Sequence, residues 1–244
     1  MSGRLLAAML AAWLLHELGH WLALRSLGLG GRLHNRWLLG LAMEVPAACQ
    51  GWRESWVALA GPAANLLALL LTQCLAWQEL FAANFVLAGF NLLPLLPLDG
   101  GRALRGMLSG LCGWLGLSRF MLLWGKAAAL AFAGSVYYFG LQRWLLLLAL
   151  WLYLVAWREE QSLPYLLGVR LAAGVGQNAR PRRRLRPRQD LPLYQLVEGF
   201  SPGWRNLVIW RGRRLDGDRL VEEWLAGGGA QRLSELAGRY NYAK

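Results

Sequence analysis

The sequence predicts an all-α polytopic membrane protein, with about five transmembrane helices, a membrane-associated hairpin and a small C-terminal α/β module. Hydrophobic residues make up 56% of the 244 residues and the mean hydropathy is +0.31, which is high for a soluble protein. The apolar residues come in long runs rather than at amphipathic spacing. These runs stop near residue 159, where charged residues become frequent. We therefore predict a membrane domain over residues 1–160.

The first predicted span covers residues 5–27, which is long enough to cross a hydrocarbon core of about 30 Å. Arg25, Arg32 and Arg36 follow closely. Because cytoplasmic loops carry an excess of arginine and lysine, the C-terminal end of this span is expected on the cytoplasmic side.

This first span contains His16-Glu17-Leu18-Gly19-His20. Ionisable residues at membrane depth indicate a functional site, and two histidines four residues apart lie on one face of a helix. In the H-E-x-x-H pattern the histidines bind zinc and the glutamate is the general base toward a zinc-bound water. The alternative is a chance pair of polar residues that face another helix.

A Gly-rich connection over residues 28–53 contains apolar runs too short to span, which favours a hairpin at the membrane surface. His34 in this connection is expected to be an exposed loop residue. The second span, residues 54–77, contains Ala60-Gly61-Pro62. Small residues let helix backbones approach closely, so this stretch is expected to pack against the histidine-bearing helix.

The third span, residues 80–98, ends with Pro94 and Pro97 and is followed by Asp99. Prolines break a helix, and irregular backbone at membrane depth is tolerated where it is buried or lines a wet cavity. We therefore expect this end to form a wall of the active site. Alternating orientation brings Asp99 to the same cytoplasmic side as His20, which makes it the third metal-ligand candidate. The alternative is a turn residue before Gly-Gly.

After a predicted Gly-rich linker, the fourth and fifth spans cover residues 118–139 and 141–157, and arginines follow from Arg158. The tail is then cytoplasmic and the N-terminus lies outside. The net charge of +12 indicates membrane orientation and a lipid-facing surface, with no nucleic-acid partner. The three cysteines, Cys49, Cys74 and Cys112, are widely separated, which indicates neither a disulfide framework nor a thiolate zinc site.

The C-terminal third is predicted to have two parts. Residues 161–188 form an amphipathic and basic linker, in which an amphipathic helix is expected over 158–176. The basic run that follows, over 180–188, is either solvated or held against anionic lipid. Residues 189–244 form the small α/β module, with a strand and turn over 207–215 and helices over 219–225 and 231–236.

Three motifs in order along the chain together resemble the site-2 protease family of intramembrane zinc metalloproteases: His16-Glu17-Leu18-Gly19-His20, Ala60-Gly61-Pro62, and Asn91-x-x-Pro94-x-x-Pro97-Leu98-Asp99-Gly100. The resemblance implies one zinc ion per chain, with His16, His20 and Asp99 as its ligands. It implies Glu17 as general base and Asn91 near the substrate backbone or oxyanion. A helical substrate must unwind before cleavage, and the strand-like residues 36–45 could hold it by edge pairing.

Within that family the chain is most similar to the sporulation branch. The resemblance implies that residues 189–244 are a CBS-like regulatory module with ATP as its ligand. Because the paired repeat usual for nucleotide binding is lacking, a second chain would be needed, which makes a homo-oligomer an expectation. That branch carries a further span before the H-E-x-x-H helix, whereas about fifteen residues precede His16 here.

The predicted function is therefore intramembrane zinc metalloendopeptidase activity on a membrane-tethered transcription-factor precursor, similar to the sigma-K precursor, during sporulation. The implied partners are this substrate, the lipid bilayer and membrane inhibitory proteins. The implied location is the bacterial inner membrane, or in a spore-former the membrane around the forespore. Three alternatives remain at this stage: a site-2 protease that cleaves another membrane-tethered regulator, a metal-ion transporter, and a catalytically silent membrane regulator.

Overall fold

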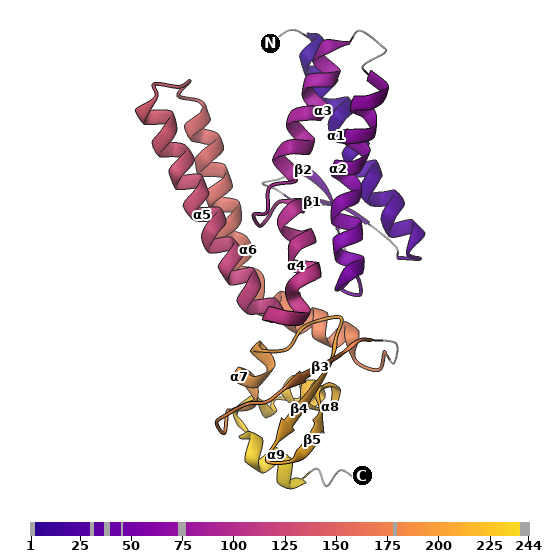
Figure 1. The fold of residues 1–244 in the computed structure, drawn as a ribbon, viewed down its shortest axis with the longest axis vertical. Helices are drawn as coiled ribbons and strands as arrows, with labels where there is room; N and C mark the ends of the chain where they lie inside the picture. The colour runs from indigo at the N-terminus through magenta and orange to yellow at the C-terminus, as the bar shows by residue number, and fades with distance from the viewer. Residues whose placement is uncertain are drawn as a thin grey trace.

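The computed structural model describes residues 3–29, 32–36, 40–44, 46–72, 77–177 and 180–239, and for 32–36 and 40–44 it describes the backbone alone. Long helices form the upper part of the molecule, and a small three-stranded sheet with short helices lies at the lower end (Figure 1). The six long helices are α1 (Gly3–Ser26), α2 (Trp52–Thr72), α3 (Gln78–Asn91), α4 (Asp99–Cys112), α5 (Trp114–Tyr138) and α6 (Leu145–Gly174).

Helices α1, α2 and α3 pack against one another, while α5 and α6 form a separate antiparallel pair that leans away from them (Figure 1). An ion pair joins the two helices of that pair, in which Lys126 Nζ donates to Glu160 Oε2 at 2.7 Å. Helix α4 begins below α3 and leads down to the start of α5. The histidine motif on α1 therefore lies within the three-helix group.

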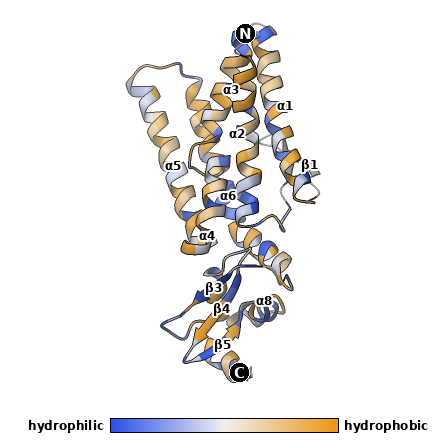
Figure 2. Cartoon of the chain, turned by 45° about the vertical axis from the view of Figure 1, so that its right-hand side comes forward, coloured by the Kyte–Doolittle hydropathy of each residue, from blue (hydrophilic) through white to orange (hydrophobic). Residues whose placement is uncertain are grey.

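By length and composition, three helices of the described chain could cross a membrane: α1, α2 and α5. Large apolar side chains on them point outward, such as Leu70 on α2 and Leu123 on α5. Figure 2 shows hydrophobic colour over most of the helical part. The predicted third span corresponds to α3, which has 14 residues, and the predicted fifth span forms the first half of α6. The expectation of five spans stays a prediction.

The predicted Gly-rich linker after Asp99 is wrong, because residues 99–112 form helix α4. Its glycines allow close packing rather than flexibility. A Cβ at Gly106 would lie 2.3 Å from Ser55 Oγ on α2, and one at Gly101 would lie 2.4 Å from the carbonyl carbon of Leu95. A glycine in a helix costs conformational entropy, and here tight contacts with neighbouring segments offset that cost.

The predicted hairpin is present as β1 (Arg32–Arg36) and β2 (Gly40–Glu44), which pair antiparallel with Arg32 opposite Glu44. The expected loop position of His34 is wrong, because its backbone belongs to β1 and pairs with Ala42. The His34 side chain and Cys74 lie outside the described residues, so the expected exposure of His34 and the expectation for Cys74 remain predictions.

The lower end contains β3 (Arg182–Leu185), α7 (Leu193–Glu198), β4 (Arg205–Trp210), β5 (Arg213–Asp216), α8 (Gly217–Leu225), the 3₁₀ turn η2 (Gly228–Ala230) and α9 (Leu233–Arg239). The strand order is β3-β4-β5, with β3 parallel to β4 and β5 antiparallel to β4. In the stretch that we expected as a linker, residues 161–174 are helical, as expected for 158–176, and they continue α6. Residues 182–185 differ from the expectation, because they form strand β3. The basic run is a strand because β4 provides a parallel partner, which no local pattern in the sequence reveals.

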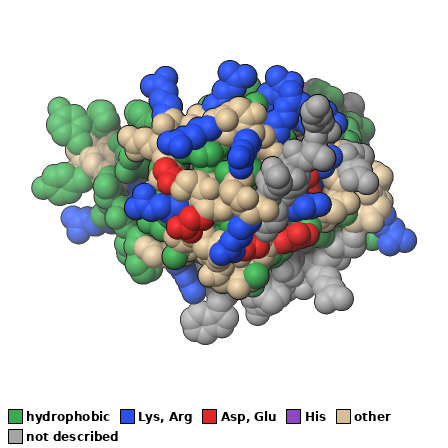
Figure 3. Space-filling model, turned by 90° about the horizontal axis from the view of Figure 1, so that it is seen from below, with side chains coloured by type: hydrophobic (Ala, Val, Ile, Leu, Met, Phe, Trp, Pro, Cys, Tyr) green, Lys and Arg blue, Asp and Glu red, His purple; other side chains and the backbone are tan. Residues whose placement is uncertain are grey.

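One apolar cluster joins this C-terminal module to the helices, because Trp114 of α5 and Leu163 of α6 belong to the same buried core as Val208 and Leu215. Polar contacts reinforce the junction, and Ser201 Oγ donates to the Ser109 carbonyl of α4 at 2.5 Å. Seen from below, basic side chains spread around this end of the molecule, with fewer acidic ones between them (Figure 3). Contact with anionic lipid there stays a prediction.

Candidate metal centre

His16 and His20 lie one turn apart on α1, and both are buried, with 5% and 8% of their surface exposed. Their rings meet edge to face, with centroids 4.7 Å apart. The i, i+4 spacing puts both imidazoles on the face of α1 that packs against α2, as the sequence predicted. Burial excludes bulk water, so the polar atoms of these rings must find partners inside the protein.

Asp99 is the first residue of α4 and lies against the two histidines. The irregular segment 92–98 brings it there after α3 ends at Asn91. Asp99 Oδ2 lies 2.9 Å from His16 Nε2 and 3.2 Å from His20 Nε2, and the two Nε2 atoms are 3.1 Å apart. Three side chains from two helices thus bring one ligand atom each to a single point.

The other ring nitrogen of each histidine has its own acceptor. His16 Nδ1 lies 2.7 Å from Asn65 Oδ1, and His20 Nδ1 lies 2.7 Å from the Val57 carbonyl oxygen. A carbonyl oxygen only accepts, so each Nδ1 carries the hydrogen and donates. In the neutral ring Nε2 is then a lone-pair acceptor, which is the form that binds a metal.

These atoms fit a zinc ion. When both rings are neutral, their two Nε2 lone pairs and the Asp99 carboxylate oxygen face one another, and a cation among them offsets that repulsion. Zinc bonds of about 2.0 Å in a tetrahedral site separate ligand atoms by about 3.3 Å, close to the 2.9–3.2 Å observed. Within the described residues, His16, His20 and Asp99 form the one such cluster of metal-ligand side chains.

Helix α2 makes room for this cluster through its small residues. A Cβ at Gly61 would lie 2.4 Å from His20 Nε2 and 2.9 Å from His16 Cε1. On the α1 side of the same helix contact, a Cβ at Gly19 would lie 2.4 Å from the Ala60 carbonyl oxygen. The structure agrees with the predicted packing of Ala60-Gly61-Pro62 against α1.

The catalytic roles expected for Glu17 and Asn91 remain predictions. Glu17 is half-buried on α1 between the two histidines in sequence. Asn91 is the last residue of α3, and its amide donates to the Leu87 carbonyl of the same helix at 3.0 Å.

Sequence reasoning missed two buried asparagines, Asn65 on α2 and Asn84 on α3, both with no exposed surface. Asn65 contacts His16 directly, as described above, and Asn84 accepts a hydrogen bond from Asn65 Nδ2 at 2.8 Å. The signal that could have found them is the one that found the histidines, namely a polar side chain inside an apolar span.

A buried ionic cluster, also missed, joins α2, α4 and α6. Glu54 accepts from Arg105 Nη2 at 2.6 Å and from Arg170 Nη1 at 2.9 Å. Both guanidinium groups lie over the Trp114 ring, at 4.9 and 5.3 Å from its centroid. Because Arg105 belongs to α4, this cluster anchors the helix that carries Asp99.

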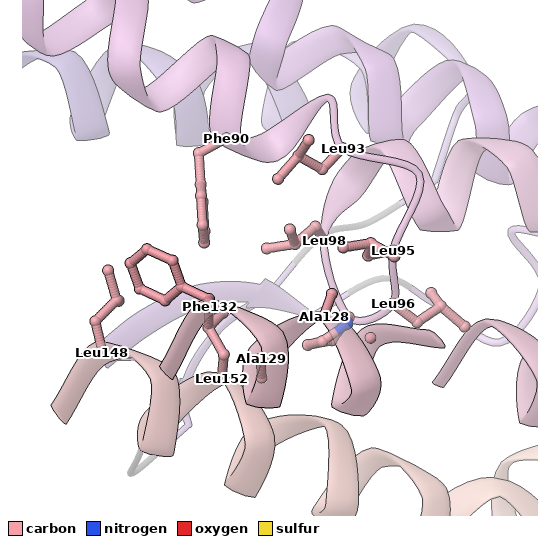
Figure 4. A pocket seen from close by; sticks show the side chains of 12 residues that line it. Phe90, Leu93, Leu95, Leu96, Leu98, Ala128, Ala129, Phe132, Leu148 and Leu152 are labelled. Atoms are coloured by element: carbon pink, nitrogen blue, oxygen red, sulfur yellow. The ribbon is translucent and has the colours of Figure 1, made fainter. Parts of the chain in front are cut away.

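An apolar cavity of about 310 Å³ lies between the irregular segment 92–98 and the α5–α6 pair. Phe90 and Leu98 line it from one side, and Phe132, Leu148 and Leu152 line it from the other (Figure 4). Two of these residues are the sequence neighbours of Asn91 and Asp99.

The chain is similar in sequence to proteins that are named as zinc metalloproteases. It is 32% identical over 131 residues to a zinc metalloprotease of Methanocaldococcus jannaschii, which covers 48% of this chain and 38% of the relative. A Synechocystis sp. relative, which is named a putative zinc metalloprotease, is 33% identical over 111 residues, covering 40% of this chain and 29% of that protein. The chain thus spans well under half the length of these curated relatives. No protein-family model matches it.

Among solved structures, the fold matches the site-2 protease from Methanocaldococcus jannaschii with a TM-score of 0.51 at 27% sequence identity. The match covers 64% of this chain and 77% of the solved chain. The sequence relatives are named as zinc metalloproteases, and the structural match is named as a site-2 protease.

Proposed function

We propose that this chain is an intramembrane zinc metalloprotease of the site-2 protease type. The observation that carries the proposal is the convergence of His16 Nε2, His20 Nε2 and Asp99 Oδ2 within 3.2 Å of one another, buried among apolar helices. The similarity to site-2 protease in fold and sequence supports it.

In this proposal His16, His20 and Asp99 would hold one zinc ion through two imidazole nitrogens and one carboxylate oxygen. A bound zinc ion supplies Lewis acidity, which makes water a stronger acid and polarises a peptide carbonyl. Glu17, next to His16 in sequence, accepts the proton of the attacking water and later gives it to the leaving amine. Apolar helices around the site limit the water that reaches it, and the edges of the β1–β2 hairpin hold the unwound substrate as an added strand.

The substrate class that we propose is a membrane-tethered transcription-factor precursor. The narrower form of the proposal comes from the resemblance in sequence to stage IV sporulation protein FB. In this narrower form the substrate is a sigma-K-like precursor, membrane inhibitory proteins bind the protease, and the protease lies in the membrane around the forespore of a spore-former. Another membrane-tethered regulator in a bacterial inner membrane is the alternative substrate. ATP binding at a CBS-like module, completed by a second copy of the chain, belongs to the same narrower form.

The test is cleavage of a co-expressed membrane-tethered sigma-factor precursor by the wild-type chain and by Glu17→Gln, with the zinc content of both determined. We expect the wild type to cleave, and Glu17→Gln to bind zinc without cleaving. The matched control is Glu198→Gln, because Glu198 lies on the C-terminal module in an exposed pair with Arg119.

Three other outcomes would contradict the proposal in different ways. Equal zinc-dependent ion flux through both proteins, without cleavage, would favour the metal-ion transporter. Absence of zinc from both would remove the metal centre. Cleavage of other tethered regulators but not of the sigma-factor precursor would retain the protease and overturn the sporulation substrate.

A further inference from the structure

Asn65 and Asn84 have buried side-chain amides and lie on the apolar helices α2 and α3. Neither helix supplies one of the three metal-ligand side chains described above. Each has no exposed surface, and each lies on a different helix, α2 and α3. Burying an amide is costly unless its donors and acceptors are paired. Their hydrogen bonds therefore show what these two residues do.

The bonds form a continuous chain from α3 to His16. Asn84 Nδ2 donates to the Leu80 carbonyl at 2.9 Å, and Asn84 Oδ1 accepts from Asn65 Nδ2 at 2.8 Å. Asn65 Nδ2 also donates to the Ala12 carbonyl at 2.9 Å, and Asn65 Oδ1 faces His16 Nδ1 at 2.7 Å.

The direction of every bond in this chain is fixed by its two backbone carbonyls, because a carbonyl oxygen only accepts. Leu80 requires the NH₂ group of Asn84, which turns Asn84 Oδ1 toward Asn65. The two hydrogens of Asn65 Nδ2 are then taken by Ala12 and Asn84, so only its oxygen remains for His16. His16 Nδ1 must therefore carry a hydrogen, and in the neutral ring its Nε2 presents a lone pair to Asp99 and His20.

The two histidines reach the same tautomer in different ways. His20 Nδ1 meets the Val57 carbonyl, which can only accept, so one backbone atom suffices. His16 Nδ1 meets a side-chain amide, which could offer either oxygen or nitrogen if it were free to turn. Asn84 and the Ala12 carbonyl remove that freedom.

We propose that Asn65 and Asn84 are positioning residues, which fix His16 as the Nδ1–H tautomer and thereby aim its Nε2 lone pair at the metal centre. The inference rests on the metal site of the proposed function. It gives α3 a part in that site, although α3 supplies no ligand. Partners of this kind contribute about 10- to 100-fold to metal affinity.

The experiment uses the full chain in detergent, with ¹⁵N-labelled histidine and no zinc. The chain has three histidines, so His16 can be assigned by comparison with His20→Gln and His34→Gln. We expect the Nδ1 of His16 to show the shift of a protonated nitrogen in the wild type. In Asn65→Leu this preference should be lost, and zinc affinity, measured by competition with a chelator, should fall about 10- to 100-fold.

Asn84→Leu is a second variant, one step further from the site. It should reduce zinc affinity several-fold. Asn65 keeps its bond to the Ala12 carbonyl, but its side-chain amide can flip more easily and present its nitrogen to His16. Asn84→Asp retains an acceptor for Asn65 and, as a neutral acid, a donor for Leu80, so it should restore the wild-type tautomer and affinity. The matched control is Thr72→Val on α2, because Thr72 is buried and its hydroxyl donates to the Ala68 and Leu69 carbonyls of its own helix.

The proposal is overturned if Asn65→Leu folds and leaves the His16 tautomer unchanged, or if Thr72→Val lowers zinc affinity as much as Asn84→Leu. A wild type that binds no zinc but shows protonated Nδ1 on His16 would remove the metal centre and leave the tautomer assignment intact. The two failures are therefore distinguishable.

Discussion

Gly61 of α2 lies directly against His20 of α1, so closely that a Cβ at position 61 would be 2.4 Å from His20 Nε2. The atom that would be displaced is the one that faces Asp99 and His16. The absence of a side chain at position 61 is therefore part of the metal centre, although glycine offers no ligand.

Gly61→Ala should lower zinc affinity by more than about 10-fold, since ligand geometry tolerates only small displacements. Zinc affinity by chelator competition is the measurement. Gly89→Ala on α3 is the control, because nothing lies within 4 Å of a Cβ there. That control should bind zinc normally and gain up to about 1 kcal/mol of stability, because alanine is the better helix former. Unchanged zinc affinity in Gly61→Ala would show that α2 can move away from α1 at no cost to the site.

Glu54→Gln should strongly destabilise the protein, because it leaves two guanidinium groups near Trp114 without their shared carboxylate. Breaking a buried ion pair from one side costs about 3–5 kcal/mol, and Glu54 is 4% exposed. Thermal unfolding in detergent is the measurement. Glu198→Gln removes an exposed pair of 3.7 Å and should change stability by less than about 1 kcal/mol. Equal effects of the two changes would contradict the role given to the buried cluster.

Gly110→Val should release the C-terminal module from α4. A Cβ at Gly110 would lie 2.1 Å from the ring of Trp204, which precedes β4, so the indole must leave its place. We expect faster proteolysis and hydrogen exchange around Trp204, while the α1–α2 region stays protected. Gly116→Val on α5 is the matched control, since a Cβ at Gly116 meets nothing within 4 Å. If both variants are as protected as wild type, the junction does not depend on this contact.

Cys49 should resist thiol reagents in the folded protein, whereas Cys112 should react. Cys49 is fully buried, and burial raises the pKa of its thiol to about 12. The reactive thiolate is then scarce below that pH, and the thiol is also inaccessible. Cys112 is exposed. The measurement is maleimide labelling at pH 7 and pH 9 of two single-cysteine variants, one that retains Cys49 and one that retains Cys112. Fast labelling of Cys49 at pH 7, without denaturant, would show that the segment before α2 opens readily.

The sequence predicted the parts of the site that lie on one helix, and the depth of the third span also made Asp99 a metal-ligand candidate. His16 and His20 share a face because helical geometry places residues four apart together, whatever surrounds them. The hydrophobic runs predicted α1, α2 and α5 for the same reason, since length and composition are local properties. The small residues near Gly61 could also be recognised, because close helix packing has a compositional pattern.

The tertiary structure decided what local pattern cannot express. It made residues 99–112 a helix, because α2 and the segment before Asp99 pack against glycines that looked like a linker. It made residues 182–185 a strand, because β4 lies beside them. It also joined Asn84 to His16 through Asn65, and brought Asp99 to His16 across 83 residues of sequence. The spacing of the histidines is set by one helix, whereas these contacts exist only because separate helices pack together.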